Sequence, residues 1–581
     1  MRKVAAGMQK KVWQVQPESD HAATLAASLR VSALTAQVLI NRDLHKADMA
    51  RSFLSPKLTD LIEPEQMYGI PAAAEHIKAA IESGKKISIY GDYDVDGITS
   101  TSILWHLLKM LGAQVDYYIP HRVDEGYGLN ADAVRQLADN GTELMITVDC
   151  GITGVEEVRL AYERGIEVIL TDHHEPGETL PEAEAIVHPR LDADYGNPHA
   201  AGAMVAFKLA WAIANRYKKD GQLPPELKQY LLNATTLAGI GTIADVVDLR
   251  GENRILAGYG LRALENSSLV GIRTLVQTAE IQASDVDSYA VAFRLAPLLN
   301  AAGRMGHARL AVELMTTDNE IRAMQIAGYL KDQNRLRQKC QRDILKQAKQ
   351  QITQAGFHHP DRKTIVLSAE NWHTGVIGIV ASRIIDDYYR PTILINATDG
   401  IGQGSGRSVA GFNLHGALTA CSDHLLSFGG HTMAAGLRID MNNIAAFAAA
   451  FEAYAHENME HGTLDSYLDI DAEARIGDFS EGVMRELNGL EPFGAGNPKP
   501  VFAARGVKLI APPRTVGSRN DHLQLSISDA SGAVRCIGFG MGKLEKKLLE
   551  TDSFSVAFEP QYNTYNGRTN LQFMLSDIQF E

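Results

Sequence analysis

Residues 86–120 read KISIYGDYDVDGITSTSILWHLLKMLGAQVDYYIP, and this stretch indicates how the first half of the chain folds. A short apolar run at 86–92 predicts a strand, a longer one at 99–112 predicts a helix, and a second strand is expected at 114–120. Gly112 ends the helical pattern, where glycine is favoured as a C-cap. Two strands joined by a helix of this length predict a βαβ unit with parallel strands.

The alternation continues to residue 174, and three of the four predicted strands end in acidic or imidazole side chains. Because the carboxyl ends of parallel strands meet at one edge of a sheet, we expect these side chains to converge on one crevice. An acid after a single strand is equally well explained as a turn residue or a helix N-cap, but three such strand ends in register favour a site. The three groups are Asp92, Asp94 and Asp96; Asp149; and Asp172, His173 and His174.

Crowded carboxylates repel one another unless a cation compensates their charge. Aspartate and histidine together suit Mn²⁺, Mg²⁺ or Zn²⁺. No cysteine pair belongs to the pattern, which argues against a closed structural zinc site. The sequence therefore predicts a divalent metal site at this edge of the sheet.

The amino-acid composition is that of an ordinary globular protein. The chain has 581 residues, of which 45% are hydrophobic and 22% charged, and these values exclude collagen-like and disordered classes. A chain of this length predicts about three or four domains. Lys+Arg is 56 and Asp+Glu is 70, so the formal net charge is −14. A nucleic acid would then bind only in a locally basic groove or on bound cations.

Four separated cysteines, without a CxxC pair, favour a reducing compartment over a disulfide scaffold. The first residues lack the apolar run of a signal peptide, and no apolar stretch reaches 18 residues. We therefore expect a cytoplasmic protein that does not cross a membrane, and we expect a monomer.

The second half of the chain predicts a long polar helix at 318–354, another α/β segment to about residue 460, and a strand-rich end typical of a small barrel. The helix carries seven cations, which indicate either a solvated helix face or a linker that lines a phosphate-binding groove. They are Lys331, Arg335, Arg337, Lys339, Arg342, Lys346 and Lys349.

In their order, the motifs closely resemble those of the DHH phosphoesterase superfamily and, within it, of the RecJ-type single-strand-specific DNA exonucleases. The matching stretches are YGDYDVDGITS (90–100), VDCG (148–151), TDHHE (171–175), GTIADVV (241–247), PLLNAAGRMG (297–306), NWHTGVIGIVASR (371–383), GSGRS (404–408), FGGHTMAAG (428–436) and PFGAGNPKPVF (492–502).

This resemblance implies a multidomain α/β architecture. A parallel-sheet DHH domain is joined by a long helix to a smaller α/β DHHA1 domain, and a β-barrel OB-fold follows. The expected segments are an N-terminal helical extension (1–70), the DHH domain (71–317), the linker helix (318–355), the DHHA1 domain (356–462) and the OB-fold (463–581).

The resemblance also implies two divalent ions, Mn²⁺ or Mg²⁺, on the first domain. By position, Asp149 matches the ligand that bridges both ions, and His174 matches a phosphate contact that Asp172 orients. Asp92 completes the first motif, and its role stays open. Asp245 is found only through the resemblance; otherwise it is a carboxylate at a helix end. The expected ligands are Asp94, Asp96, Asp149, His173 and Asp245.

The second domain is expected to bind substrate. After the predicted strand at 391–399, Gly404–Ser408, which includes Ser405 and Gly406, is expected to form a loop whose amides cradle a phosphate, with Arg407 as a bidentate clamp. His431 would add a donor. Arg407 is alternatively a turn residue, and His431 a capping or core histidine.

Three further residues each have two possible roles. His373, at a predicted helix start, either faces an anion or caps the helix. Asn300 and Arg304 either contact the nucleotide or belong to a loop that stabilises the first domain.

The C-terminal barrel carries aromatic and basic side chains suited to stacking on a single strand, although we expect most of the aromatics to be core and only one or two to stack. The aromatics are Phe502, Phe539, Phe554, Phe558, Tyr562, Tyr565 and Phe573, beside Lys508, Arg514, Arg519, Arg535 and Arg568.

The resemblance implies a 5′→3′ exonuclease that is specific for single-stranded DNA, releases mononucleotides and acts in recombination and repair. Its implied partners are a single-strand-binding protein and a RecQ-type helicase. Two alternatives stay open: a DHH phosphoesterase acting on short oligonucleotides, cyclic dinucleotides or pyrophosphate, and a non-catalytic binding module on a decayed DHH domain. The extra barrel favours a long strand over the former, and the complete ligand set argues against the latter.

Overall fold

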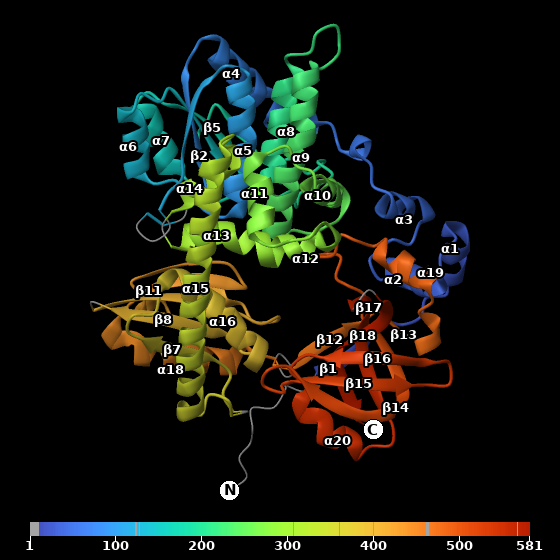
Figure 1. Ribbon diagram of the computed structural model, residues 1–581. Coiled ribbons are helices and arrows are strands. Elements are labelled where there is room, and N and C mark those ends of the chain that lie inside the picture. Colours follow the sequence, from blue (N-terminus) through green and yellow to red (C-terminus); the bar gives the residue numbers. More distant parts are fainter. Residues whose placement is uncertain are drawn as a thin grey trace.

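The computed structural model of the chain describes residues 11–121, 125–126, 128–305, 307–359, 361–398, 400–460, 464–565 and 568–580. The side chains of Tyr565 and Arg568, both expected near the strand-binding face of the barrel, lie outside the described part of the chain. Figure 1 shows two α/β domains along one long helix, with a barrel beside the second of them, and confirms the fold class expected from the sequence.

The first domain is built on a five-stranded sheet in the order β3-β2-β4-β5-β6, with every neighbouring pair parallel. The chain runs from β2 to β3 and then crosses to the other side of β2 for β4. The strand order therefore reverses between β2 and β4, the position where open α/β sheets bind ligands. The strands are β2 (Lys86–Gly91), β3 (Gln114–Tyr118), β4 (Leu144–Val148), β5 (Glu167–Thr171) and β6 (Ala185–Val187).

Helices cover both faces of this sheet, because its central strands are apolar throughout. One face packs on α4 (Ile70–Glu82), α5 (Val95–Met110), α8 (Gly202–Asn215) and α9 (Pro225–Ala244), and the other on α6 (Ala131–Asp139) and α7 (Val155–Glu163). The domain is completed by α10 (Gly251–Leu264), α11 (Val270–Thr278), α12 (Ser288–Ala290), a π-helical turn (Val291–Leu295), α13 (Ala296–Arg304) and α14 (Ala308–Thr316).

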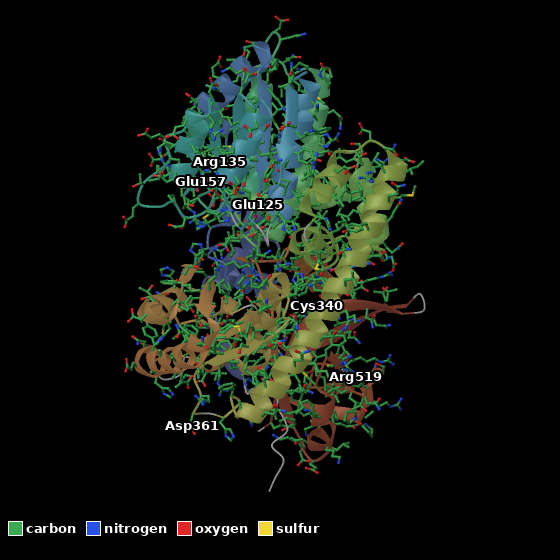
Figure 2. All side chains as sticks on the ribbon, turned by 90° about the vertical axis from the view of Figure 1, so that its left-hand side faces the viewer. Glu125, Arg135, Glu157, Cys340, Asp361 and Arg519 are labelled. Atoms are coloured by element: carbon green, nitrogen blue, oxygen red, sulfur yellow. The ribbon has the colours of Figure 1, made fainter. Side chains whose placement is uncertain are left out.

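Helix α15 (Glu320–Ala355) joins the two α/β domains and has 36 residues. Its first half buries Ala323, Ile326 and Leu330 in the core of the first domain. Its second half buries Ile344 and Ile352 in a core shared with the second domain. Figure 2 shows the helix passing both domains, with Cys340 labelled near its middle. The helix is thus packed at both ends, which fixes the two domains relative to each other.

The second domain has a mixed sheet in the order β10-β11-β9-β8-β7. Only β7 and β8 are parallel, and α16 connects them. The elements are β7 (Ile365–Ala369), α16 (Thr374–Tyr388), β8 (Thr392–Thr398), β9 (Ile401–Arg407), α17 (Leu414–Ala420), β10 (Ser427–Gly430), β11 (Ala434–Asp440) and α18 (Ile444–Asn458).

The C-terminal domain is a closed barrel, because β14 pairs with both β15 and β17. Its elements are β12 (Ser466–Ile470), β13 (Ala472–Glu473), α19 (Glu481–Asn488), β14 (Phe502–Val516), β15 (His522–Ser528), β16 (Ala533–Gly538), α20 (Glu545–Leu549), β17 (Phe554–Tyr565) and β18 (Arg568–Phe580).

The N-terminal segment packs on this C-terminal domain. Helices α1 (Ala22–Leu29), α2 (Ala33–Ile40) and α3 (Ala47–Leu54) share the hydrophobic core of the barrel. Residues Lys11–Val15 form strand β1, parallel to β12, where a helical extension was expected. No single described helix is long and apolar enough to cross a membrane; α1 and α2 pass that test only as a pair bent by 111°.

Candidate metal centre

The loop after β2 brings two carboxylates to the start of α5. Asp94 is the N-cap of α5, and its Oδ1 accepts the amides of Asp96 at 2.9 Å and Gly97 at 3.2 Å. The N-cap interpretation of this motif is therefore correct, but it accounts for only one of the carboxylates. Asp96 instead points across to the first turn of α8.

Asp96 is anchored by the N-terminus of α8. Its two carboxylate oxygens accept the amides of Gly202 at 2.6 Å and Ala203 at 2.8 Å. The positive end of the helix dipole favours a carboxylate at this position. A Cβ on Gly202 would lie 2.8 Å from Asp149 Oδ1 and 2.9 Å from Asp96 Oδ2, so only glycine lets α8 approach both acids.

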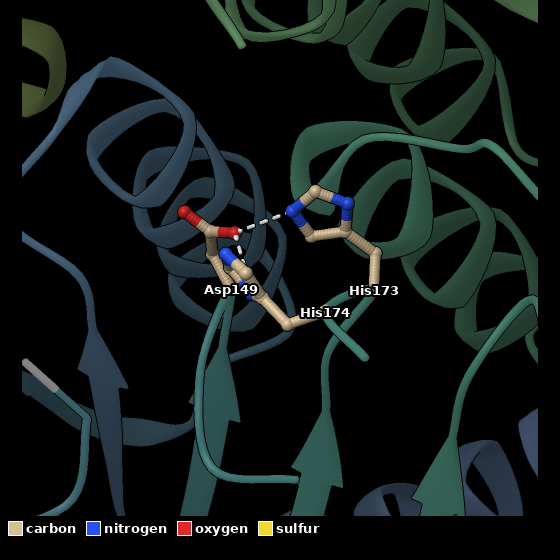
Figure 3. A group of neighbouring side chains, drawn as sticks. All are labelled: Asp149, His173 and His174. Atoms are coloured by element: carbon tan, nitrogen blue, oxygen red, sulfur yellow. Dashed lines mark ion pairs between the residues drawn. The ribbon is translucent and has the colours of Figure 1, made fainter. Parts of the chain in front are cut away.

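Asp149 follows β4 with a φ of 61°, in the left-handed region that is uncommon for residues other than glycine but that aspartate adopts more readily than most. Its Oδ1 is buried and has no hydrogen-bond partner among the described residues, and the same is true of His173 Nε2, which lies 3.0 Å away. Figure 3 shows the two side chains turned toward each other with His174 beside them, its Nδ1 3.9 Å from the same oxygen. Buried polar atoms without partners are rare and indicate a ligand.

His173 lies among three acids. Its Nε2 is also 3.8 Å from Asp96 Oδ2 and 3.7 Å from Asp245 Oδ2. Asp245 reaches this position because α9 ends there, with Asp245 as its C-cap. Three sets of potential ligand atoms lie within 4.8 Å of one another: Asp149, His173 and His174; Asp96, His173 and Asp245; and Asp92, Asp94 and Asp149. The structure thus brings together every metal-site residue predicted in the first domain.

Burial and mutual repulsion make these groups reluctant to ionise. Burial, and then the neighbouring acids, raise the pKa of Asp96 and Asp149 well above the usual range. The same causes raise the pKa of Asp245 to about 7. Burial lowers the pKa of His173 to about 3, so its imidazole is neutral. Buried carboxylates and a neutral imidazole, without a thiol, fit hard divalent cations such as Mn²⁺ and Mg²⁺.

Asp172 orients the adjacent histidines. Its Oδ1 contacts His174 Nδ1 at 2.7 Å and accepts the amide of His173 at 2.7 Å. Burial alone would raise the pKa of Asp172, but these hydrogen bonds and the charge of His174 lower it to about 2. Burial also opposes the charged form of His174, yet the hydrogen bond and charge of Asp172 outweigh it and raise the pKa of His174.

His188 is a buried neighbour that the sequence pattern did not reveal. It follows β6, and its Nε2 lies 2.8 Å from the carbonyl oxygen of His174. Strand β6 has only three residues, too few to stand out by periodicity. The apolar residues Ala-Ile-Val before His188 could have indicated a short strand, which would place His188 at the same edge of the sheet as the acids.

The prediction that Gly404–Ser408 forms a loop whose amides bind phosphate is wrong. Gly404 to Arg407 lie in β9, whose main chain pairs with β8 on one side and β11 on the other. Its three alternate glycines face a tightly packed layer; a Cβ on Gly404, for example, would lie 2.8 Å from Leu437 Cδ1. Glycine is therefore needed for packing here and does not form an amide nest.

The opposite face of β9 presents polar side chains to α16. Ser405 lines a depression of 360 Å³ together with Thr374 and Arg438. Arg407 donates from Nη1 to Gly406 O at 2.7 Å and contacts Ser405 Oγ at 3.3 Å. The guanidinium is thus held on this face beside the depression.

The remaining predicted residues of this domain have mainly structural contacts. His373 is the N-cap of α16, and its Nδ1 accepts the amide of Gly375 at 3.1 Å. Ser408 is buried and donates to Phe412 O at 2.7 Å. His431 is exposed in the turn between β10 and β11, and its amide donates to Ala434 O at 2.8 Å.

Helix α13 links the metal centre to the second domain. Asn300 and Arg304 belong to this helix, so the alternative interpretation that placed them in a loop is wrong. A Cβ on Gly303 would lie 2.5 Å from Tyr93 O, so α13 contacts the aspartate loop directly. Arg304 Nη1 donates to Gly375 O at 3.0 Å, across the domain boundary.

Burial separates the barrel aromatics into two groups. Phe502, Phe554, Phe558 and Phe573 are fully buried, as expected for most of them. Phe539 and Tyr562 are 59% and 40% exposed. Of the predicted barrel aromatics whose side chains are described, Phe539 and Tyr562 are therefore the two that can offer a face to a base.

The parallel sheet with its buried aspartate–histidine centre defines a metal-dependent hydrolase of the DHH phosphoesterase class. Residues 86–235 match the N-terminal domain of the DHH family, 361–457 match the DHHA1 domain and 470–577 match the RecJ OB domain. The exact domain boundaries expected from the sequence remain predictions.

The chain belongs to the RecJ family. It is 37% identical over 572 residues to the single-stranded-DNA-specific exonuclease RecJ of Bacillus subtilis, covering 98% of this chain and 71% of that relative. It is 40% identical over 462 residues to RecJ of Thermus thermophilus, covering 80% of this chain and 65% of that relative. The crystal structure of T. thermophilus RecJ in complex with Mn²⁺ matches 98% of this chain and 79% of that one, with a TM-score of 0.84 at 34% identity.

Proposed function

We propose that this protein is a single-stranded-DNA-specific exonuclease that removes mononucleotides from the 5′ end and acts in recombination and repair. The observation that carries the proposal is a pair of buried ligand atoms, Asp149 Oδ1 and His173 Nε2, which have no hydrogen-bond partner in the described part of a chain of RecJ type. The barrel, which matches the RecJ OB domain, suits a long single strand. The 5′→3′ direction rests on the family resemblance.

The metal centre would hold two divalent ions, Mn²⁺ or Mg²⁺. When bound, such ions polarise the scissile phosphate and lower the pKa of a water molecule toward neutrality. Asp149 belongs to two of the three sets of ligand atoms, which supports it as the ligand that both ions would share. The proposed ligands are Asp94, Asp96, Asp149, His173 and Asp245, and Asp92 adds negative charge beside them.

Protein side chains would position the strand. His174, kept protonated over a wider pH range by Asp172, would contact a phosphate oxygen. Arg407 and Ser405 on β9 would bind the terminal nucleotide, with Arg304 fixing the second domain against the first. Asn300, His373 and His431 stay candidates for weaker contacts. A single-strand-binding protein and a RecQ-type helicase are proposed partners, and a monomeric, cytoplasmic enzyme is proposed.

The test is digestion of a single-stranded oligonucleotide of about 50 nucleotides, labelled at either end, with Mn²⁺, Mg²⁺ or EDTA and beside a blunt duplex. We expect immediate release of a labelled mononucleotide from the 5′ end only, dependent on metal and absent on duplex. Hydrolysis of dinucleotides, cyclic dinucleotides or pyrophosphate without degradation of long strands would move the function to the small-substrate alternative. Release of the labelled mononucleotide from the 3′ end would overturn the proposed 5′→3′ direction.

A further inference from the structure

The cations of α15 separate into two groups. Those in its first half have partners: Lys331 pairs with Glu280 at 2.8 Å, and Arg335 pairs with Asp332 at 3.2 Å. In the second half, Arg342, Lys346 and Lys349 follow a spacing of four and three residues and therefore share one helix face.

This face lines a groove of 790 Å³ together with Arg519, which belongs to the turn between β14 and β15 of the barrel. The groove thus has one wall from the linker helix and one cation from the C-terminal domain. In Figure 2, Arg519 is labelled beside the lower half of α15. Its lining is Arg342, Leu345, Lys346, Lys349, Gln350, Thr353, Gln354 and Arg519, without a carboxylate.

Two of the four cations of this α15–Arg519 groove have acidic partners, and two have none among the described residues. Lys349 pairs with Asp387 at 2.7 Å, and Arg519 lies 3.6 Å from Asp521. Among the described residues, no carboxylate forms an ion pair with Arg342 or Lys346. In a chain of net charge −14, a groove lined by three cations of the linker helix and one of the barrel is a local exception. Like charges facing each other cost free energy that a polyanion between them would remove.

We propose that the α15–Arg519 groove binds backbone phosphates of the single strand at a distance from the metal centre. The inference rests on the proposed function, because it assigns a second contact for the same substrate. The cations at 342, 346 and 349 span about 10 Å of helix axis, at 1.5 Å per residue, so they can neutralise more than one phosphate. Contacts of this kind bind any sequence, which suits a nuclease that must advance along the strand.

The test replaces three groove cations in the full-length protein: Arg342→Gln, Lys346→Gln and Arg519→Gln together. Binding of a 30-nucleotide single strand is measured in EDTA over a range of salt concentrations, so that no turnover is needed. Each phosphate contact contributes about 0.7 to the slope of log K against log salt, so the slope should become shallower by about 2. Hydrolysis of a dinucleotide with Mn²⁺ should stay unchanged.

The matched control is Lys218→Gln, Lys219→Gln and Lys228→Gln, which removes the same charge from three exposed residues. Two of them lie in the loop between α8 and α9 and the third in the first turn of α9, and this loop is at the far end of the first domain in Figure 1. Its salt slope should equal that of the wild type. An unchanged slope in the groove variant, or an equal decrease in both variants, would overturn the proposal, as would loss of dinucleotide hydrolysis in the groove variant. If the wild type binds long strands but does not degrade them, the proposed function fails while the groove is still tested.

Discussion

At the scale of single residues, the metal centre is a set of acids whose neighbours oppose their ionisation. Asp96, Asp149 and Asp245 all have raised pKa values, because they are buried and near one another. A divalent cation must displace the protons that these carboxylates otherwise keep. Metal affinity is therefore coupled to pH.

Binding of Mn²⁺ should weaken as the pH falls. Without metal, the pKa of Asp245 is about 7, so this carboxylate is mostly ionised at pH 8 and mostly protonated at pH 6. Only the ionised form is a ligand, so this group alone should raise the apparent Kd for Mn²⁺ about 10-fold between pH 8 and pH 6. Calorimetric titration at the two pH values measures the change. An affinity that is equal at both would show that these carboxylates are not the ligands.

Asp172→Asn should change the pH profile through His174. The wild-type carboxylate raises the pKa of His174 against the effect of burial, and asparagine keeps the shape without the charge. The pKa of His174 should fall, so the alkaline limb of kcat/KM should move to lower pH, with a loss of about 10–100-fold in activity. Reduced activity with an unmoved limb would assign Asp172 a purely structural role.

At the scale of elements, much of the centre follows from the sequence. The acidic and imidazole side chains after β2, β4 and β5 were predicted to meet because parallel strands end at one edge, and the structure brings Asp94, Asp149 and His173 together there. Asp245 was not predictable from periodicity, because the end of α9 reaches the site only through the tertiary packing of α8, α9 and α5. Strand β9 was mistaken for a loop because its alternating glycines have low strand propensity, and their packing partners, such as Leu437, are remote in sequence.

Gly202→Ala tests the close approach of α8. The added methyl would lie within 3 Å of carboxylate oxygens of Asp149 and Asp96, so both must move. We expect a loss of about 1–3 kcal/mol in the free energy of unfolding and weaker Mn²⁺ binding. Gly328→Ala on α15 is the control, since a Cβ there meets open space, and it should stabilise the protein slightly. Wild-type Mn²⁺ affinity in Gly202→Ala would contradict the geometry.

At the scale of the whole molecule, residues 491–498 join the barrel to the first domain. Leu249, four residues beyond Asp245, donates its amide to Ala495 O at 2.8 Å. Arg254 and Arg42, both buried, donate to carbonyl groups of the same loop. The sequence identified this loop as a family motif but did not show what it contacts, because Leu249, Arg254 and Arg42 all lie more than 200 residues away from it.

Asn497→Ala should weaken the contacts of residues 491–498 with the rest of the protein. Asn497 is fully buried; its Nδ2 donates to Leu490 O and Pro492 O, and its Oδ1 accepts Arg42 Nε at 2.8 Å. Each buried group left without a partner costs about 1–3 kcal/mol, so the Tm should fall, while dinucleotide hydrolysis at 25 °C should persist because the metal centre is untouched. Asn458→Ala, on an exposed helix end, is the control. An equal Tm in the two variants would refute the role of the loop.

The most direct test of the account is the number of Mn²⁺ ions bound by the wild type and by Asp149→Ala, counted at pH 8 by equilibrium dialysis and metal analysis. We expect about two ions per chain in the wild type, the number that a two-metal site requires. The variant should lose bound Mn²⁺ and turnover on single strands, while its circular dichroism stays that of the wild type. A folded variant that binds as much Mn²⁺ as the wild type and degrades single strands at the same rate would contradict the assignment of Asp149 as the shared ligand.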